Sequence, residues 1–180
     1  MESIVVETVK KYKEKKKDMK ILSVVGTRPQ LIKAAVISRK LRSYHNEVLV
    51  HTGQHYDYNM SEVFFDELDI PRPDYNLGIS GGTHGNMTGR MLLKLEEIIQ
   101  EERPELVLLY GDTNSTLAGA IVAAKLFIPI CHIESGVREA GIKNNTFTNP
   151  EEINRIITDH VSTYLMCCTK TDRKSTRLNS

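Results

Sequence analysis

Short apolar runs that alternate with helix-like segments constrain the fold of this 180-residue chain more than any other feature. Runs rich in Val, Ile and Leu are typical of strands buried on both faces, and intervening helices allow such strands to lie parallel. The periodicity predicts strands over residues 20–25, 47–51, 106–110, 130–133 and 164–168, and helices over residues 30–43, 60–68, 87–102, 116–126 and 150–161. We therefore expect an α/β fold, with a Rossmann-like parallel sheet covered by helices on both faces.

Composition and charge exclude several classes of function. Hydrophobic residues make up 40% of the chain and charged residues 26%, which is ordinary for a globular protein with one core. The net charge is +1, but Met1–Lys20 holds seven lysines against four acids, so the remainder is mildly acidic and offers no basic footprint for nucleic acid. No apolar run approaches the roughly 20 residues of a membrane span, and no signal peptide is recognisable. We expect a cytoplasmic protein that binds no membrane.

The three cysteines predict free thiols. Cys167 and Cys168 are adjacent and Cys131 lies far from them in the sequence, so the spacing fits no metal-ligand motif. Free thiols are typical of a reducing compartment. Because the sequence also lacks a P-loop and the glycine fingerprint that binds NAD, we expect no metal and no cofactor.

Polar residues collect directly after four of the predicted strands. These turns are Gly26-Thr27-Arg28, Gly53-Gln54-His55, Gly111-Asp112-Thr113 and the segment 132–136. In open parallel sheets, ligands bind in the crevice outside the carboxyl ends of the strands. The four turns therefore predict one shared binding rim.

The first of these turns favours an anion. Arg28 and Lys33 flank the start of a predicted helix, where free backbone N–H groups and the helix dipole attract negative charge. Alternatively, Arg28 pairs with a neighbouring acid and Pro29 only begins the helix. The second turn is also ambiguous, because Gln54 and His55 fit either a ligand contact or ordinary hydrogen bonds at the end of a strand.

Carboxylates and guanidinium groups converge on the second half of this rim. The cluster comprises Asp112, Glu134, Glu151, Glu152, Arg138 and Arg155. Glu151 and Arg155 lie four positions apart at the start of a predicted helix, so they share one face. Such a mixture can hold a phosphorylated substrate and move protons. It can equally be an ion-pair network that fixes the loops.

Six motifs follow one another along the chain: GTRPQLIK, HTGQHYDYNM, GTHGNMTGRML, GDTNSTLAGA, HIESGVR and NPEEINRIITDHVS. Together they resemble the non-hydrolysing UDP-N-acetylglucosamine 2-epimerase family. The resemblance covers residues 19–171, which we expect to form the N-terminal Rossmann-like domain of a GT-B-like enzyme, with the C-terminal nucleotide-binding domain missing. Residues 1–18 are then a Lys-rich leader that need not be native. Residues 172–180 are a non-native tail, because one reverse translation of them resembles a sequencing adapter.

The resemblance implies a reaction and its participants. Such enzymes interconvert UDP-N-acetylglucosamine and UDP-N-acetylmannosamine for surface polysaccharides, eliminating UDP to give 2-acetamidoglucal and adding it back with C2 inverted. The partner is therefore a UDP-sugar, the complete enzyme is expected to be a homodimer, and the fragment is expected to be inactive alone.

The resemblance also implies roles for individual residues. The groups that handle the C2 proton are Asp112, Glu134, Glu151 and, in support, Arg155. The cations that bind the UDP-sugar are Arg28, Lys33 and Arg138. The residues that match a possible regulatory site are Gln54 and His55.

Departures from the family pattern leave alternatives open. The departing residues are Gln30 for Glu, Met87 for Gln, Ser135 for Ala and Val137 for Leu. Of these, Met87 is the one expected to alter either a substrate contact or a hydrogen bond that supports one. The alternatives are a hydrolysing UDP-N-acetylglucosamine 2-epimerase, a related diacetamido-sugar nucleotide 2-epimerase, and a non-catalytic module that binds sugar nucleotides.

Overall fold

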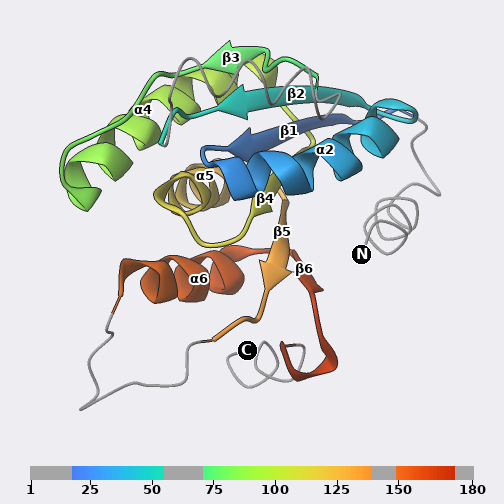
Figure 1. Ribbon diagram of the computed structural model, residues 1–180. Coiled ribbons are helices and arrows are strands. Elements are labelled where there is room, and N and C mark those ends of the chain that lie inside the picture. Colours follow the sequence, from blue (N-terminus) through green and yellow to red (C-terminus); the bar gives the residue numbers. More distant parts are fainter. Residues whose placement is uncertain (1–17, 55–70, 139–148, 173–180) are drawn as a thin grey trace.

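The computed structural model describes residues 18–54, 71–138 and 149–172, which form one six-stranded sheet (Figure 1). Its strands are β1 (Lys20–Val25), β2 (Asn46–His51), β3 (Tyr75–Asn76), β4 (Leu106–Tyr110), β5 (Ile130–Ser135) and β6 (Tyr164–Cys167). All pairs are parallel, and the strands lie in the order β3-β2-β1-β4-β5-β6. The order reverses direction between β1 and β4, as in a doubly wound, Rossmann-like fold.

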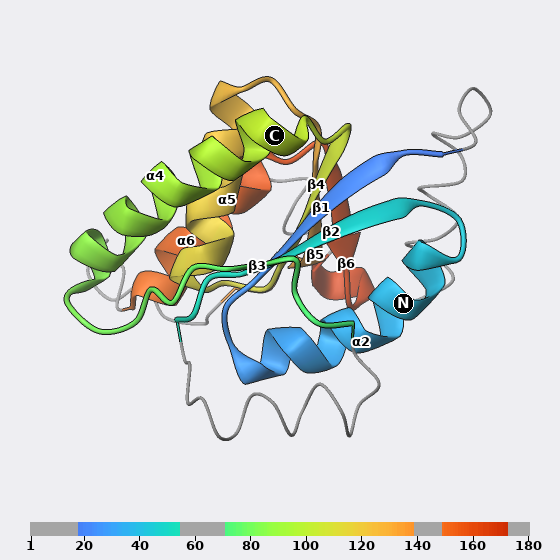
Figure 2. The ribbon, with the colours of Figure 1, turned by 90° about the horizontal axis from the view of Figure 1, so that it is seen from above.

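Helices cover both faces of this sheet (Figure 2). They are α2 (Arg28–Arg42), α4 (His84–Glu102), α5 (Asn114–Lys125) and α6 (Pro150–Val161). One core lies between α2 and the face that contains Leu108, and the other lies between α4, α5 and the face that contains Val107 and Leu109. Successive residues of β4 thus enter opposite cores, as expected of a strand buried on both faces. The predicted fold class is confirmed.

The boundaries of the elements differ from the predicted ones for local reasons. Helices α2, α4 and α5 begin two or three residues earlier than predicted, directly after the N-cap residues Thr27, Thr83 and Thr113. Strand β5 continues two residues beyond its predicted end, through a β-bulge. Strand β3 was not predicted, because two residues are too few to show a periodicity. The helix predicted over residues 60–68 lies outside the described residues.

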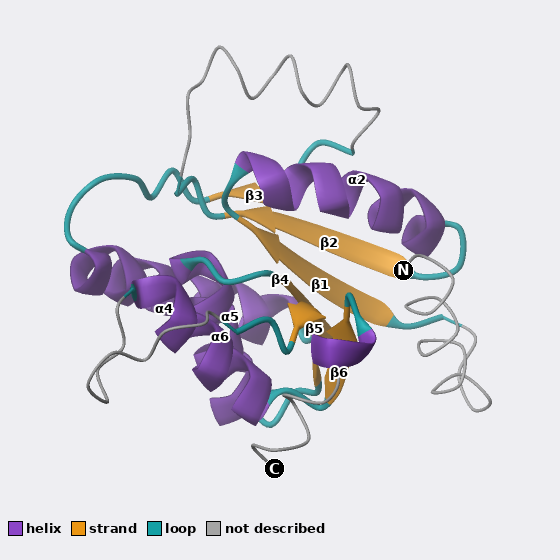
Figure 3. Cartoon of the chain, turned by 60° about the horizontal axis from the view of Figure 1, so that its bottom comes forward, coloured by secondary structure: helices purple, strands orange, loops and turns teal. Residues whose placement is uncertain are grey.

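The parallel arrangement gathers the turns that follow the strands along one edge of the sheet. Figure 3 shows the strand arrows pointing toward this edge. At the edge, α2 begins directly after β1 and α5 directly after β4, so the reversal of strand order lies between two helix N-termini. This is the place where open α/β sheets bind ligands.

The cysteines of the chain are free. Cys131 is buried in β5, and this burial raises the pKa of its thiol to about 12, so it stays protonated. Within the described ranges, no group of three or more His, Cys, Asp or Glu side chains is placed to hold a metal ion. The described helices include none that is long and apolar enough to cross a membrane.

Candidate active site

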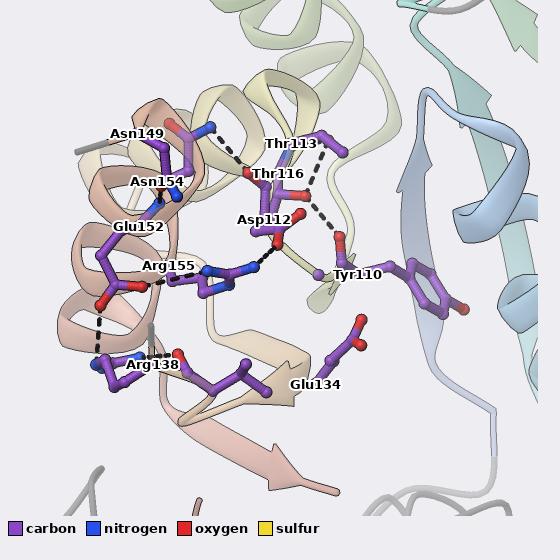
Figure 4. Close-up of polar contacts among 12 residues, drawn as sticks. Tyr110, Asp112, Thr113, Thr116, Glu134, Arg138, Asn149, Glu152, Asn154 and Arg155 are labelled. Atoms are coloured by element: carbon purple, nitrogen blue, oxygen red, sulfur yellow. Dashed lines mark hydrogen bonds and ion pairs between the residues drawn. The ribbon is translucent and has the colours of Figure 1, made fainter. Parts of the chain in front are cut away.

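An ion pair between Asp112 and Arg155 joins the turn after β4 to helix α6 (Figure 4). Gly111 begins this turn with φ +63°, a left-handed conformation that costs glycine little and bends the chain sharply. Thr113 then caps α5, its Oγ1 accepting a hydrogen bond from Thr116 N at 3.3 Å. The Asp112 side chain remains 28% exposed, so a ligand can reach it.

Glu152, not Glu151, holds Arg155 in place. Helix α6 begins at Pro150 after the N-cap Asn149, whose Oδ1 accepts a hydrogen bond from Glu152 N at 2.7 Å. Arg155 Nη1 donates to Glu152 Oε2 at 3.2 Å, and the Glu152 side chain is only 9% exposed. Glu151 is exposed on the first turn of α6. Although the four-residue spacing places Glu151 near Arg155, the ion pair forms at a spacing of three, because Glu152 lies on the buried side of the helix.

Glu134 occupies a strained position near the end of β5. It has φ +70°, and it is the residue skipped where Ile133 and Ser135 both pair with β6. A left-handed backbone costs a residue with a side chain about 1–2 kcal/mol. The Glu134 carboxylate pairs with Lys33 of α2, and the two side chains remain 33% and 37% exposed. A methyl group on Gly111 would approach Glu134 Oε2 to 3.2 Å, so this carboxylate lies beside the Asp112 turn.

Arg138 binds to a buried carboxylate of α6. Its Nη2 donates to Asp159 Oδ2 at 2.8 Å, and its Nε lies 3.9 Å from Glu152 Oε1. Burial raises the pKa of Asp159, but hydrogen bonds from His132 and Arg138 outweigh this effect and lower it below its ordinary value. His132 is fully buried, and its Nδ1 lies 2.7 Å from Asp159 Oδ1.

The remaining predicted site residues lie on the β1 and β2 side of the rim. Arg28 is exposed as the first residue of α2. Gln54 Oε1 accepts hydrogen bonds from Ser115 N at 3.2 Å and from Ser115 Oγ at 3.0 Å, so Gln54 ties the turn after β2 to the start of α5. His55 lies outside the described residues.

Three residues that hold the turns of the rim were given no site role from the sequence: Gln30, His132 and Asp159. Gln30 Nε2 donates to Thr113 Oγ1 at 2.9 Å, and so connects α2 to the Asp112 turn. A signal existed for His132 and Asp159, since each lies two to four residues from a predicted site residue on the same element. Gln30 likewise lies two residues from Arg28 on α2, but its role depends on hydrogen bonds to the turn after β4, which no pattern within the helix shows.

The arrangement places two partly exposed carboxylates, each beside a cation, at the ends of neighbouring strands. Asp112 pairs with Arg155, and Glu134 pairs with Lys33. Burial lowers the pKa of Arg155, but Asp112 and Glu152 together raise it above its ordinary value, so this guanidinium stays charged. Carboxylates in such positions can exchange protons with a ligand, and the cations can bind its anionic groups.

A family model described as UDP-N-acetylglucosamine 2-epimerase matches residues 39–178. This chain belongs to the UDP-N-acetylglucosamine 2-epimerase family. It is 56% identical over 154 residues to a UDP-2,3-diacetamido-2,3-dideoxy-D-glucuronate 2-epimerase of Pseudomonas aeruginosa. It is 46% identical over 153 residues to a UDP-N-acetylglucosamine 2-epimerase of Methanocaldococcus jannaschii. Each match covers 84% of this chain but only 42% and 40% of the relative.

Solved structures of the epimerase family have the same fold. The crystal structure of the M. jannaschii UDP-GlcNAc 2-epimerase in complex with UDP-GlcNAc and UDP is similar with a TM-score of 0.82 and 44% identity. The Neisseria meningitidis UDP-GlcNAc 2-epimerase bound to UDP-GlcNAc gives a TM-score of 0.80 and 29% identity. Both matches cover 89% of this chain and 43% of the solved chain, which fits one Rossmann-like half of a GT-B-like epimerase.

Proposed function

We propose that residues 19–171 are the N-terminal domain of an epimerase that interconverts UDP-N-acetylglucosamine and UDP-N-acetylmannosamine without net hydrolysis. The observation that carries the proposal is the position of Asp112 and Glu134, two reachable carboxylates at the ends of neighbouring strands of an epimerase-family fold. The name of the M. jannaschii relative supports this substrate. We further propose that residues 1–18 and 172–180 are not part of the native domain.

The chemistry of the substrate requires an indirect route. The C2 proton lies next to an acetal carbon, so no carbonyl group stabilises a carbanion there. In our proposal a carboxylate takes the proton from C2 while the C1–O bond breaks, and its electron pair leaves with UDP. The C2–H electron pair forms the C1=C2 bond of 2-acetamidoglucal. UDP then adds back to C1 while a proton reaches C2 from the opposite face, and the sequence is redox-neutral.

Three carboxylates are proposed to exchange the proton with C2. Asp112, in the turn after β4, and Glu134, near the end of the neighbouring strand β5, are both partly exposed. Glu151 is exposed on the first turn of α6. Arg155 orients Asp112. We assign the acid and base roles to the set, because neighbouring carboxylates titrate as a coupled unit.

The cations of the rim are proposed to bind the diphosphate. Arg28 lies at the N-terminus of α2, where the helix dipole also favours an anion. Lys33 is 37% exposed and can exchange Glu134 for a phosphate oxygen. Arg138 is held by Asp159, so it offers the ligand a fixed charge.

The complete enzyme is proposed to act as a cytoplasmic homodimer that supplies surface polysaccharide precursors. Its second domain closes on the rim, so the 180-residue chain alone is expected to be inactive. We propose a regulatory contact at Gln54 and His55, which requires Gln54 to release Ser115 when an effector binds.

Proton NMR of UDP-N-acetylglucosamine in D₂O tests the proposed reaction. The complete enzyme should produce UDP-N-acetylmannosamine with deuterium at C2, and Asp112→Asn should lower turnover about 10²- to 10⁴-fold. Glu96→Gln, which changes an exposed carboxylate on α4, serves as the matched control. Epimerisation without deuterium exchange would reject the elimination route, and release of free N-acetylmannosamine would identify a hydrolysing enzyme.

The isolated chain provides a second test. Conversion of the nucleotide sugar by these 180 residues alone would contradict the expected inactivity. Calorimetric binding of UDP-N-acetylglucosamine tighter than millimolar, together with no turnover by the complete protein, would favour a non-catalytic binding module.

A second candidate substrate follows from the relative in P. aeruginosa. Its 56% identity supports epimerisation of UDP-2,3-diacetamido-2,3-dideoxy-D-glucuronate by the same elimination and re-addition. The two candidates are separated by measuring kcat/KM of the complete enzyme for both nucleotide sugars. A preference of about tenfold or more corresponds to roughly 1.4 kcal/mol of differential transition-state binding and would decide between them.

A further inference from the structure

We propose that His132 is held as a doubly protonated imidazolium that fixes the turn carrying Asp112, and that it is therefore a positioning residue. The part of this inference that concerns catalysis depends on the proposed function, because it takes Asp112 to be a proton carrier. The charge of His132 and its hold on the turn do not depend on that function.

The contacts of the His132 ring carry the inference. The ring is fully buried in β5, its Nδ1 lies 2.7 Å from Asp159 Oδ1, and its Nε2 lies 2.6 Å from the carbonyl oxygen of Gly111. A carbonyl oxygen can only accept a hydrogen bond. A neutral imidazole has one N–H, so one of its nitrogens would direct a lone pair at an oxygen within hydrogen-bond distance.

Asp159 cannot supply the missing hydrogen. Its Oδ2 accepts hydrogen bonds from Gly136 N at 3.0 Å and from Arg138 Nη2 at 2.8 Å. These donors favour the ionised carboxylate and outweigh the effect of its burial on the pKa. With two acceptors facing its two nitrogens, the ring satisfies both only by carrying two protons.

The other surroundings of His132 contain little charge that would oppose this. The register neighbours on the flanking strands are Leu109 of β4 and Leu165 of β6. Helix α5 has one ionisable residue, Lys125, at its far end. Helix α6 contributes Asp159, and the ring is linked to Arg138 only through that carboxylate.

The charged residues nearest to His132 along strand β5 and in the turn after β4 each have an ionic partner of their own. On the same strand, Glu134 is paired with Lys33, and in the turn after β4, Asp112 is paired with Arg155. The buried imidazolium therefore faces one carboxylate, Asp159, as its direct ionic partner.

The consequence is that strand β5 and helix α6 hold consecutive peptide groups of the Asp112 turn. Gly111 N donates to Ile133 O at 2.9 Å, and Gly111 O accepts from His132. Asn154 Nδ2 donates to the Asp112 carbonyl oxygen at 2.9 Å. Removing His132 frees the Gly111 carbonyl, and the direction of the adjacent Asp112 side chain is then no longer set.

The charge state can be measured on the unaltered 180-residue chain. Long-range ¹H–¹⁵N correlation spectra of the histidine rings, assigned through the backbone, report whether each ring nitrogen carries a proton. At pH 7.5, where an ordinary exposed histidine is mostly neutral, His132 should give the imidazolium pattern at both nitrogens. A neutral tautomer pattern at that pH would overturn the proposal.

The positioning role is tested by hydrogen exchange. In His132→Gln, and in the isosteric Asp159→Asn, the amide of Gly111 and its neighbours in the turn should exchange about tenfold faster or more. The control His160→Gln changes an exposed histidine of α6 and should leave these rates unchanged. Far-UV circular dichroism checks that the fold is retained, and unchanged exchange in both folded variants would overturn the positioning role.

A kinetic measurement connects the inference to catalysis. In the complete enzyme, His132→Gln should lower kcat about tenfold or more while KM changes by less than about threefold, because ligand contacts remain. A rise in KM as large as the fall in kcat would contradict a positioning role, because it would show that substrate binding is lost as well. If the complete enzyme shows no epimerase activity at all, the proposed function is wrong. The charge of His132 and its hold on the Asp112 turn are still decided by the NMR and hydrogen-exchange measurements, which do not depend on activity.

Discussion

Gln30 and Tyr110 lie 80 positions apart in the sequence, and a 2.6 Å hydrogen bond from Gln30 Nε2 to the Tyr110 carbonyl oxygen joins them. The other end of the same amide, Oε1, accepts from Gly26 N at 2.8 Å and from Thr27 N at 3.2 Å. One buried side chain thus connects the turns after β1 and β4, on either side of the point where the strand order reverses.

Replacing Gln30 with leucine should destabilise the chain. Gln30→Leu keeps the approximate volume but leaves the buried Gly26 and Thr27 amides without their acceptor, so the free energy of unfolding should fall by about 2–4 kcal/mol. Chemical denaturation monitored by circular dichroism measures this. Glu96→Gln, on the exposed side of α4, is the control and should change stability by less than about 0.5 kcal/mol. Equal effects of the two variants would show that the amide is not a structural link.

Alanine should have opposite effects at two glycines. At Gly26 a methyl group would come within 3.0 Å of Ser115 Oγ and Thr52 Oγ1, so Gly26→Ala should cost about 1–3 kcal/mol or more through overpacking. At Gly89, inside α4, no atom lies within 4 Å of the added methyl group, so Gly89→Ala should stabilise by about 0.5–1 kcal/mol. Thermal melts of both variants provide the measurement. Destabilisation by Gly89→Ala would mean that α4 is packed differently.

Substitutions of the adjacent residues Glu151 and Glu152 of α6 should affect stability to different extents. Glu152 is buried between Arg155 and Arg138, so Glu152→Gln should lower the free energy of unfolding by about 2–3 kcal/mol. Glu151 is exposed, so Glu151→Gln should leave stability within about 0.5 kcal/mol.

Glu151→Gln, which should fold normally, is nevertheless expected to lose turnover. If Glu151 exchanges protons with C2, Glu151→Gln should lower kcat of the complete enzyme about 10²- to 10⁴-fold. Denaturant titration and the NMR assay give the two readings for each variant. A stable Glu151→Gln enzyme with full activity would remove Glu151 from the proposed set.

Buried His51 should make stability depend on pH. Burial lowers the pKa of His51 to about 4, whereas in the unfolded chain it is near 6.5. Because the unfolded state binds the proton first, the stability that His51 contributes is complete above pH 6.5 and is lost as the pH falls toward 4. Between pH 7.5 and 5.0 the wild type should lose about 2 kcal/mol more than His51→Gln.

Urea denaturation at the two pH values measures this difference. Asp159 does not interfere, because its lowered pKa places its titration below this window. His160→Gln is the control and should follow the wild type, since His160 is exposed on α6. Parallel pH dependence of the wild type and His51→Gln would contradict neutral burial of His51.

The sequence predicted elements well where burial imposes a period. Strand β4 and helix α6 begin and end at their predicted residues. The apolar run of β4 fits only a buried strand, and Asn149 and Pro150 mark the start of the amphipathic helix as its N-cap and its first residue. Strand β3 pairs only at Tyr75 and Asn76, so its existence depends on the neighbouring strand β2 and not on its own pattern. The bulge at Glu134 likewise depends on the partner strand β6.

The sequence by itself determined the alternation of most strands and helices along the chain and the rim that carries Asp112 and Glu134, since parallel strands bring their carboxyl ends to one edge. Only the tertiary structure decided that Glu152 takes the buried ion pair and that His132 faces two acceptors. Hydrophobic periodicity specifies which side of an element is buried, whereas hydrogen-bond partners depend on how elements far apart in the chain are packed together.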